Sequence, residues 1–166
     1  MNQYVLLTLS CIVSYFVGTI LFAIIVTKIV TGKDIRKVGN TNPGTSNVTK
    51  NIGPVAGVIT GLLDILKALI LIIIARIFLF KGDSFFDWIA LYLIGMFVIL
   101  GHCRPFWNNF KKGGGGVGSS VGVCAFFTPV EFAISIIIGT IITYVFMKNA
   151  NYKFGRWSFR LFWYLL

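Results

Sequence analysis

Two polar loops rich in amide, hydroxyl and basic side chains interrupt a chain that is otherwise strongly apolar. The first loop runs from Asp34 to Lys50, and the second runs from Gly101 to Ser120. Asn, Ser and Thr side chains and glycine amides can donate hydrogen bonds to an anion, while Lys and Arg balance its charge. About two membrane crossings separate the loops, so both can face the same side of a membrane. Together they predict one composite site for a phosphate-bearing substrate.

The first loop has the composition of an anion-binding turn. Asn42-Pro43-Gly44 is a strong turn former. Arg36, Lys37 and Lys50 would supply positive charge to an anion held by the backbone and side chains of the turn. The same loop also fits an ordinary solvated turn that ends in a helix N-cap within residues 45–47. Both interpretations stay open from this loop alone.

The second loop contains four consecutive glycines, Gly113 to Gly116, directly after Lys112. Because glycine has no Cβ, such a backbone can approach a ligand closely enough for its amides to contact phosphate oxygens. A helix that begins near Ser119 would add the positive end of its dipole. The spacing does not match the Walker phosphate loop, in which Lys and Ser or Thr follow the last glycine. The loop therefore predicts either a phosphate cradle or a flexible hinge.

Three titratable residues lie within apolar stretches or at their ends. His102 fits a general base or a phosphate ligand, and it also fits a simple interfacial polar residue. Asp64 and Lys67 are three residues apart in an apolar stretch, so on a helix they share one face. Charges at that depth usually pair and point into the protein. We therefore predict an interior ion pair, the alternative being two side chains that snorkel to the membrane interface.

The composition places the chain among integral membrane proteins. Hydrophobic residues make up 57% of the chain and charged residues only 12%, and the mean hydropathy is +0.86, which is far from the balance of a soluble domain. The stretch from Val5 to Val26 carries no charge. As a helix it would be about 33 Å long, which is enough to cross a hydrocarbon core of about 30 Å.

The apolar pattern predicts an all-α, polytopic membrane bundle with four to five membrane helices. A single membrane domain over residues 1–147 would contain them, and residues 148–166 would form a basic, aromatic tail suited to a membrane interface. The last apolar stretch divides near Pro129. The expected helices cover about residues 4–29, 53–80, 85–101, 117–128 and 130–147.

The positive residues predict the orientation of the bundle in the membrane. Lys and Arg gather around both polar loops, whereas the turn between the second and third apolar stretches has only one Lys. Cytoplasmic loops are enriched in Lys and Arg, so the motif loops should be cytoplasmic and the N-terminus outside. The net charge of +10 then reflects this bias and contact with anionic lipid headgroups rather than nucleic-acid binding. The three cysteines form no CxxC pair, so neither a disulfide nor a metal site is expected.

The residues and their order resemble a known family of bacterial membrane enzymes. The match covers about residues 14 to 130, and it is similar to the acyl-phosphate:glycerol-3-phosphate acyltransferases, the PlsY family. The residues that carry it are Gly18, Lys28, Asp34-Ile35-Arg36, Gly39, Asn42-Pro43-Gly44, Asn47, Gly53, Asp64, Lys67, Gly101-His102, Pro105, Phe110, Lys112-Gly113-Gly114 and Gly116-Val117.

The resemblance implies an enzyme of the bacterial inner membrane that needs no cofactor. Its substrates would be acyl phosphate and glycerol 3-phosphate, and it would transfer the acyl group to the sn-1 hydroxyl to give lysophosphatidic acid and phosphate without coenzyme A. Membrane lipids would surround it, and nucleic acid would not be a partner. The catalytic residues implied are Asn42 and His102. The residues implied to bind substrate or phosphate are Arg36, Asn47, Lys50, Lys112, Gly113, Gly114, Gly116 and Ser119.

Several positions depart from the family pattern. Asn40-Thr41 stands where the family has Ser-Gly, Lys50 stands in place of an Arg, and Gly115 stands in place of a Lys. No counterpart of the third family motif follows Met147, as expected of a shortened, frameshifted or diverged C-terminus. These departures leave a second hypothesis open, namely a catalytically impaired homologue that binds a phosphorylated lipid or metabolite without turnover.

Overall fold

The computed structural model describes residues 2–149, and the basic, aromatic tail expected at 148–166 lies almost entirely outside this range. No strand occurs in the described range, so all of its regular structure is helical. The chain divides into two units after Phe126, and each is described by itself. The first unit contains α1 to α5 and nearly all of α6, whereas α7 belongs to the second.

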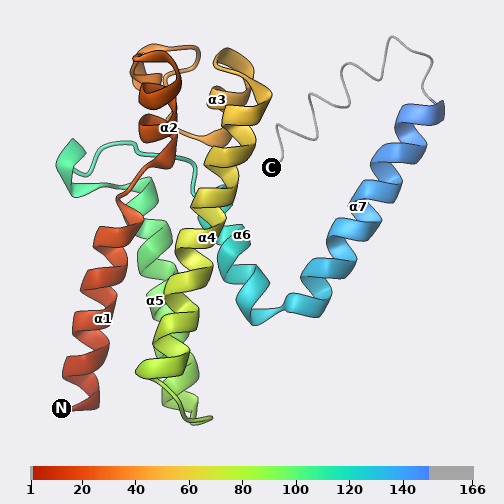
Figure 1. Ribbon diagram of the computed structural model, residues 1–166. Coiled ribbons are helices and arrows are strands. Elements are labelled where there is room, and N and C mark those ends of the chain that lie inside the picture. Colours follow the sequence, from red (N-terminus) through yellow and green to blue (C-terminus); the bar gives the residue numbers. More distant parts are fainter. Residues whose placement is uncertain (1, 150–166) are drawn as a thin grey trace. The chain divides into compact units, whose positions relative to one another are not determined.

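Seven α-helices and two short 3-10 helices form the described chain (Figure 1). They are α1 (Gln3–Gly18), α2 (Phe22–Thr31), η1 (Ile35–Lys37), α3 (Thr45–Asn51), α4 (Pro54–Phe78), α5 (Phe85–Cys103), η2 (Phe106–Asn108), α6 (Val117–Phe127) and α7 (Pro129–Asn149). The last break falls at Thr128, immediately before Pro129, since proline cannot continue the preceding helix.

Three helical segments among the described residues are long and apolar enough to cross a membrane. They are Gln3–Thr31, Pro54–Phe78 and Phe85–Asn108, and two shorter apolar helices follow at Val117–Phe127 and Pro129–Ile142. Large apolar side chains such as those of Leu9, Ile74 and Tyr92 are exposed on these helices, as expected of surfaces that face lipid. The predicted all-α membrane bundle is confirmed.

The first membrane segment is broken, whereas the sequence predicted one helix over residues 4–29. Helix α1 ends at Gly18 and α2 begins at Phe22, with an extended Leu21 (φ −94°, ψ 98°) between them. Lys67 Nζ lies 2.9 Å from the carbonyl oxygen of Ile20 and 3.4 Å from that of Gly18. Because the Lys67 side chain satisfies these carbonyls, an irregular backbone is tolerated at membrane depth.

Helices α1 and α5 pack with their backbones in close contact at two glycines. A Cβ added at Gly18 would collide with the carbonyl oxygen of Val98, and one added at Gly101 would collide with that of Tyr15. Small residues at such positions let membrane helices approach closely. The contact therefore fixes the end of α5, from which the second polar loop begins.

Replacing Gly101 by alanine is expected to lower the free energy of unfolding by about 1–3 kcal/mol, because overpacking forces backbone shifts. The added methyl group would meet the Tyr15 backbone rather than a side chain that can move away. Thermal unfolding in detergent would measure the effect. Gly115→Ala serves as the control, since a Cβ at Gly115 would meet nothing within 4 Å, and equal melting temperatures for the two variants would contradict the close packing.

Both polar loops of the first unit pack against helix α4. On the side of the first loop, a Cβ added at Gly57 would collide with the side chain of Thr49 in α3. On the side of the second loop, one added at Gly118 in α6 would lie 2.8 Å from Asp64 Cβ. In Figure 1, α2 and α3 lie at one end of the first unit, and the N-terminus of α1 and the α4–α5 turn lie at the other. Both loops therefore contact the N-terminal half of α4.

The turn at the opposite end of α4 is held by Arg76. Its guanidinium donates to the carbonyl oxygens of Phe80 at 2.9 Å and Gly82 at 2.7 Å, and it pairs with Asp83 at 2.7 Å. The side chain of Asp83 is 83% exposed. This turn is thus ordered without any contribution from the polar loops.

Candidate functional site

Asn47 organises the first polar loop from inside. Its side-chain amide donates to the carbonyl oxygens of Ile35 at 3.3 Å, Val38 at 2.9 Å and Asn42 at 3.0 Å. Asn51 Nδ2 in turn donates to Asn47 Oδ1 at 2.7 Å, and Asn47 is only 1% exposed. The amide therefore holds the loop backbone, and its polar atoms are largely used within the protein.

Helix α3 starts within this loop, at Thr45. The N-cap is Gly44, and no side chain caps the helix. The alternative prediction, a side-chain N-cap at one of residues 45–47, is therefore wrong. The backbone of the loop is shaped instead by Asn47 and by positive φ angles at Gly39 (60°) and Thr41 (63°).

Replacing Asn47 by leucine is expected to release the segment between Ile35 and Asn42, because three carbonyl oxygens would lose their common donor. Each oxygen keeps a bond from a backbone amide, donated by Val38, Thr41 and Gly44 respectively, so each lost side-chain bond costs about 0.5–1.5 kcal/mol. Hydrogen exchange read by mass spectrometry should show faster exchange in this segment and little change in α5. Unchanged exchange in the segment would mean that the amide does not hold the loop.

Arg36 links the first polar loop to the second. Its guanidinium makes two-pronged contact with Asp34, with Nη2 at 2.6 Å and Nε at 3.0 Å from Oδ2. The guanidinium also lies 5.5 Å from the ring centroid of Trp107 in the second loop. The hydrogen bond from Arg36 lowers the pKa of Asp34, and the carboxylate raises the pKa of Arg36. The charge of Arg36 is therefore partly balanced before any ligand binds.

The Asp34–Arg36 pair is expected to contribute a pH-dependent stability of about 0.2–1 kcal/mol, the usual range for exposed pairs. The folded-state pKa of Asp34 is lowered, so this contribution is complete above about pH 4, the ordinary aspartate pKa. It is lost as the pH falls through the folded-state value. The melting temperatures of wild type and Asp34→Asn should differ at pH 7 and converge in acid, and a constant difference would contradict the pair.

The glycines of the second loop fold back onto the end of α5. The amide of Gly113 donates to the carbonyl oxygen of Cys103 at 2.8 Å, and that of Gly114 donates to the carbonyl oxygen of His102 at 3.0 Å. A Cβ added at Gly114 would collide with His102 Nε2, whereas one added at Gly115 would meet nothing within 4 Å. Gly114 is thus packed directly on the imidazole, and Gly115 is open.

Aromatic residues attach the second loop to the end of α1. Trp107 Nε1 donates to the carbonyl oxygen of Thr19 at 3.0 Å, and the Tyr15 hydroxyl donates to the carbonyl oxygen of Arg104 at 2.7 Å. The sequence interpretation did not single out Tyr15 or Trp107. Their aromatic character at a membrane boundary is a weak signal, because Trp and Tyr are common there for general reasons.

Asp64, Lys67 and His102 form a buried cluster beneath the second loop. Lys67 Nζ lies 2.8 Å from Asp64 Oδ1 and 2.8 Å from His102 Nδ1. Asp64 Oδ1 lies 3.4 Å from the same imidazole nitrogen. The three side chains are between 3% and 4% exposed. His102 of α5 thus contacts the ion pair between Asp64 and Lys67, both of which belong to α4.

Each polar loop contributes one buried side-chain oxygen without a partner in the described part of the chain. Among the described residues these are Asn42 Oδ1 and Ser119 Oγ, and Thr27 Oγ1 of α2 shares the property. Ser119 is fully buried at the start of α6. A Cβ added at Gly61 in α4 would lie 3.2 Å from the Thr45 side chain, so the start of α3 packs against α4. Buried polar atoms are nearly always paired, so each of these three oxygens marks a place where a ligand or water binds, and two of the three belong to the polar loops.

Other residues of the predicted site lie at its rim or support it. Lys50, in the last turn of α3, and Lys112 are exposed to solvent. Gly116 has a φ of 78°, which allows the chain to turn into α6. No group of three or more His, Cys, Asp or Glu side chains in residues 2–149 is placed to hold a metal ion. The arrangement offers hydrogen-bond donors and positive charge, the chemistry that holds a phosphate.

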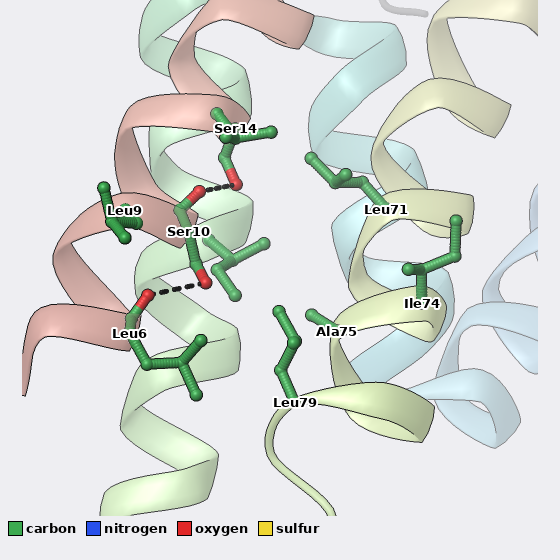
Figure 2. Close-up of a pocket in the computed structure, with 10 residues that line it drawn as sticks. Leu6, Leu9, Ser10, Ser14, Leu71, Ile74, Ala75 and Leu79 are labelled. Carbon is green, nitrogen blue, oxygen red and sulfur yellow. Dashed lines mark hydrogen bonds between the residues drawn. The ribbon is translucent and has the colours of Figure 1, made fainter. Parts of the chain in front are cut away.

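A separate apolar pocket of about 290 Å³ lies between α1 and α4 (Figure 2). Leu6, Leu9, Leu71 and Leu79 are among the residues that line it. The two serines in its wall donate to carbonyl oxygens of their own helix. The pocket therefore presents hydrocarbon only, and it contains none of the polar groups that a phosphate requires.

Comparison with known sequences identifies relatives that are all glycerol-3-phosphate acyltransferases. The family model for glycerol-3-phosphate acyltransferase matches residues 8–154. Glycerol-3-phosphate acyltransferase 1 of Lactobacillus johnsonii is 40% identical over 140 residues, which cover 84% of this chain and 65% of that protein. Glycerol-3-phosphate acyltransferase of Finegoldia magna is 32% identical over 140 residues, which cover 84% of this chain and 67% of the relative.

Two solved structures share the fold. The glycerol 3-phosphate form of PlsY (YgiH), an integral membrane glycerol 3-phosphate acyltransferase, has a TM-score of 0.67 and 34% identity over 82% of this chain and 64% of its own. The lysophosphatidic acid form has a TM-score of 0.66 and 30% identity over 85% of this chain and 65% of its own. The chain thus spans about two thirds of the length of these relatives. The resemblance seen in the motifs is confirmed, and the chain belongs to the glycerol-3-phosphate acyltransferase family.

Proposed function

We propose that this protein transfers a fatty acyl group from acyl phosphate to the sn-1 hydroxyl of glycerol 3-phosphate. The hydroxyl oxygen attacks the acyl carbonyl carbon and forms the ester bond, while the bond from that carbon to the phosphate oxygen breaks. The proton of the hydroxyl leaves with the departing phosphate. The products are lysophosphatidic acid and inorganic phosphate, and no redox step or coenzyme A is needed.

One observation carries this proposal, namely that each of the two polar loops buries a side-chain oxygen that has no partner among the residues that the structure describes. Asn42 Oδ1 comes from the first loop and Ser119 Oγ comes from the second. Both can contact a polar substrate that bears a hydroxyl and a phosphate. The start of α6, an eleven-residue helix, adds backbone amides and the positive end of its dipole.

The predicted residues then divide into those that contact substrate and those that shape the loops. We assign contact with the reacting groups to Asn42 and His102, and phosphate binding to Ser119 and the amide of Gly116. The amides of Gly113 and Gly114 shape the loop, because they already donate to the carbonyl oxygens of Cys103 and His102. Arg36, Lys50 and Lys112 would attract the phosphates from the exposed rim. Asn47 holds the first loop rather than the substrate, because its amide nitrogen already serves three carbonyl oxygens.

Catalysis in such a site rests on positioning and on stabilisation of developing charge. Acyl phosphate is an activated mixed anhydride, so the attack does not require a strong protein base. The acyl chain would stay in the hydrocarbon region while the phosphate reaches the loops. We place the loops on the cytoplasmic side of a bacterial inner membrane and the N-terminus outside, in accord with the positive residues around the loops.

An assay of isolated membranes tests the proposal. Membranes that contain the protein should convert radiolabelled glycerol 3-phosphate to lysophosphatidic acid when palmitoyl phosphate is supplied, and palmitoyl-CoA should not replace it. Membranes with Asn42→Ala should show at least about tenfold less product, because a group that contacts the reacting atoms is lost. Product no greater than that from membranes lacking the protein would refute the activity.

A second candidate function is binding of a phosphorylated lipid or metabolite without turnover. It is favoured by Gly115, which stands where the family motif has a lysine. A side chain at Gly115 would meet nothing within 4 Å of its Cβ, so Gly115→Lys can be accommodated. If the missing lysine limits turnover, this variant should produce lysophosphatidic acid faster than wild type while binding glycerol 3-phosphate at least as tightly. A variant with unchanged turnover would remove the argument from this position.

A further inference from the structure

We propose that Lys67 fixes the tautomer of His102, so that the imidazole presents Nε2–H toward the glycine-rich loop as a hydrogen-bond donor and does not act as a proton acceptor. Lys67 and Asp64 would then be positioning residues that act through His102. The catalytic part of this inference rests on the proposed acyl transfer, whereas the tautomer itself does not.

The contacts of the Lys67 ammonium determine which imidazole nitrogen carries the proton. An ammonium has three N–H donors and no acceptor. Lys67 Nζ lies 2.8 Å from a carboxylate oxygen of Asp64 and 2.9 Å from the carbonyl oxygen of Ile20, both of which can only accept. The third close contact, at 2.8 Å, is His102 Nδ1. This nitrogen must therefore accept, which leaves the proton of a neutral imidazole on Nε2.

The other protonation states fit the cluster less well. A doubly protonated His102 would place two positive groups 2.8 Å apart in a site with one carboxylate. An Nδ1–H tautomer would need a neutral Lys67 as its acceptor or a bond to Asp64 Oδ1, which lies farther away at 3.4 Å. Neutralising Lys67 would leave the Asp64 charge buried and unpaired, which is costly at membrane depth.

The opposite edge of the imidazole faces the loop proposed to hold phosphate. A Cβ added at Gly114 would collide with Nε2, so this nitrogen lies directly against the loop. The amide of Gly114 donates back to the carbonyl oxygen of His102 at 3.0 Å. The same side chain thus connects the ion pair in α4 with the second polar loop. A donor at this place stabilises negative charge in the substrate, which a base there would not do.

The tautomer is measured by nitrogen NMR of the full-length protein in lipid nanodiscs. His102 is the only histidine in the chain, so histidine labelled with ¹⁵N and an affinity tag free of histidine give one ring to assign. We expect one protonated and one unprotonated nitrogen at pH 7, and couplings to both ring protons will identify the protonated one as Nε2. A protonated Nδ1, alone or together with Nε2, would overturn the inference.

Variants separate the role of Lys67 from a general structural effect. Lys67→Met should change the nitrogen spectrum by releasing Nδ1, while Lys81→Met, an exposed lysine in the α4–α5 turn, should leave it unchanged. If Lys67→Met does not fold, the wild-type spectrum still decides the tautomer. A folded Lys67→Met variant with the wild-type spectrum would contradict the assignment of this role to Lys67.

The catalytic part is tested with two amide substitutions of His102. Glutamine places its amide near the Nε2 position, whereas asparagine places it near Nδ1. His102→Asn should be less active than His102→Gln by about tenfold or more, as expected when one donor to a charged group is removed. Equal losses in both variants, with the wild-type tautomer as predicted, would overturn the donor role and leave the acyl transfer itself standing. Absence of turnover in wild type would instead count against the proposed function.

Discussion

Replacing Asp64 by leucine is expected to destabilise the protein by about 3–5 kcal/mol, which is the cost of leaving one member of a buried ion pair without its partner. Lys67 would then hold an uncompensated charge in the interior, with 4% of its side chain exposed. Unfolding in mixed micelles monitored by circular dichroism would measure the change. Asp83→Leu removes a carboxylate of the same type that is 83% exposed, and it should cost less than about 1 kcal/mol.

The double replacement Asp64→Leu with Lys67→Met should recover only part of this loss. The ion pair would be gone, but the carbonyl oxygen of Ile20 would also lose the ammonium 2.9 Å away. A buried carbonyl without a partner costs about 1–3 kcal/mol. Full recovery would mean that Lys67 does not stabilise the break between α1 and α2, and an Asp64→Leu variant as stable as wild type would contradict the buried pair.

Replacing Gly114 by alanine is expected to lower kcat/KM for glycerol 3-phosphate by about 100-fold, the cost of moving a catalytic group by about 1 Å. The added methyl carbon would collide with His102 Nε2. Either the imidazole or the glycine-rich loop must then move, and both are proposed to contact substrate.

Gly115→Ala is the matched control for this prediction. It adds the same methyl group to the next residue, where nothing lies within 4 Å. Its kcat/KM should stay within about threefold of wild type, as usual for a substitution that makes no new contact. Equal losses in the two variants would show that the loop needs glycine flexibility in general and that the contact with His102 is unimportant.

The sequence was sufficient to predict the membrane bundle because its signal is local. Each long apolar stretch must be helical to satisfy its own backbone in lipid, and the spans at Pro54–Phe78 and Phe85–Asn108 follow directly. The break after Gly18 could not be predicted in this way. No charge or proline marks residues 19–21, and the residue that satisfies the broken backbone is Lys67, 47 positions beyond Ile20.

The candidate site shows the same division between local and distant contacts. The spacing of Asp64 and Lys67 places both on one helix face, and they lie 2.8 Å apart in the structure. The contact of Lys67 with His102 joins two helices across 35 positions. The order of the motifs in the sequence could not predict this contact, because the contact depends on how α4 and α5 pack.

Asn47 illustrates a different limit of the sequence interpretation. Its place in the motif is compatible with direct contact to substrate or with a structural role. The three carbonyl oxygens around its amide favour the structural role. A residue type indicates which hydrogen bonds are possible, and only the fold determines which groups are within reach.

The most direct test of the account is whether the two polar loops form one site for glycerol 3-phosphate. A double-mutant cycle with Asn42→Ala and Ser119→Ala, read by calorimetric binding of glycerol 3-phosphate in nanodiscs, measures their coupling. If both oxygens contact one ligand, each single variant should bind more weakly and the coupling energy should be at least about 0.5 kcal/mol. Wild-type binding in either single variant, or losses that add within about 0.3 kcal/mol, would contradict a shared site.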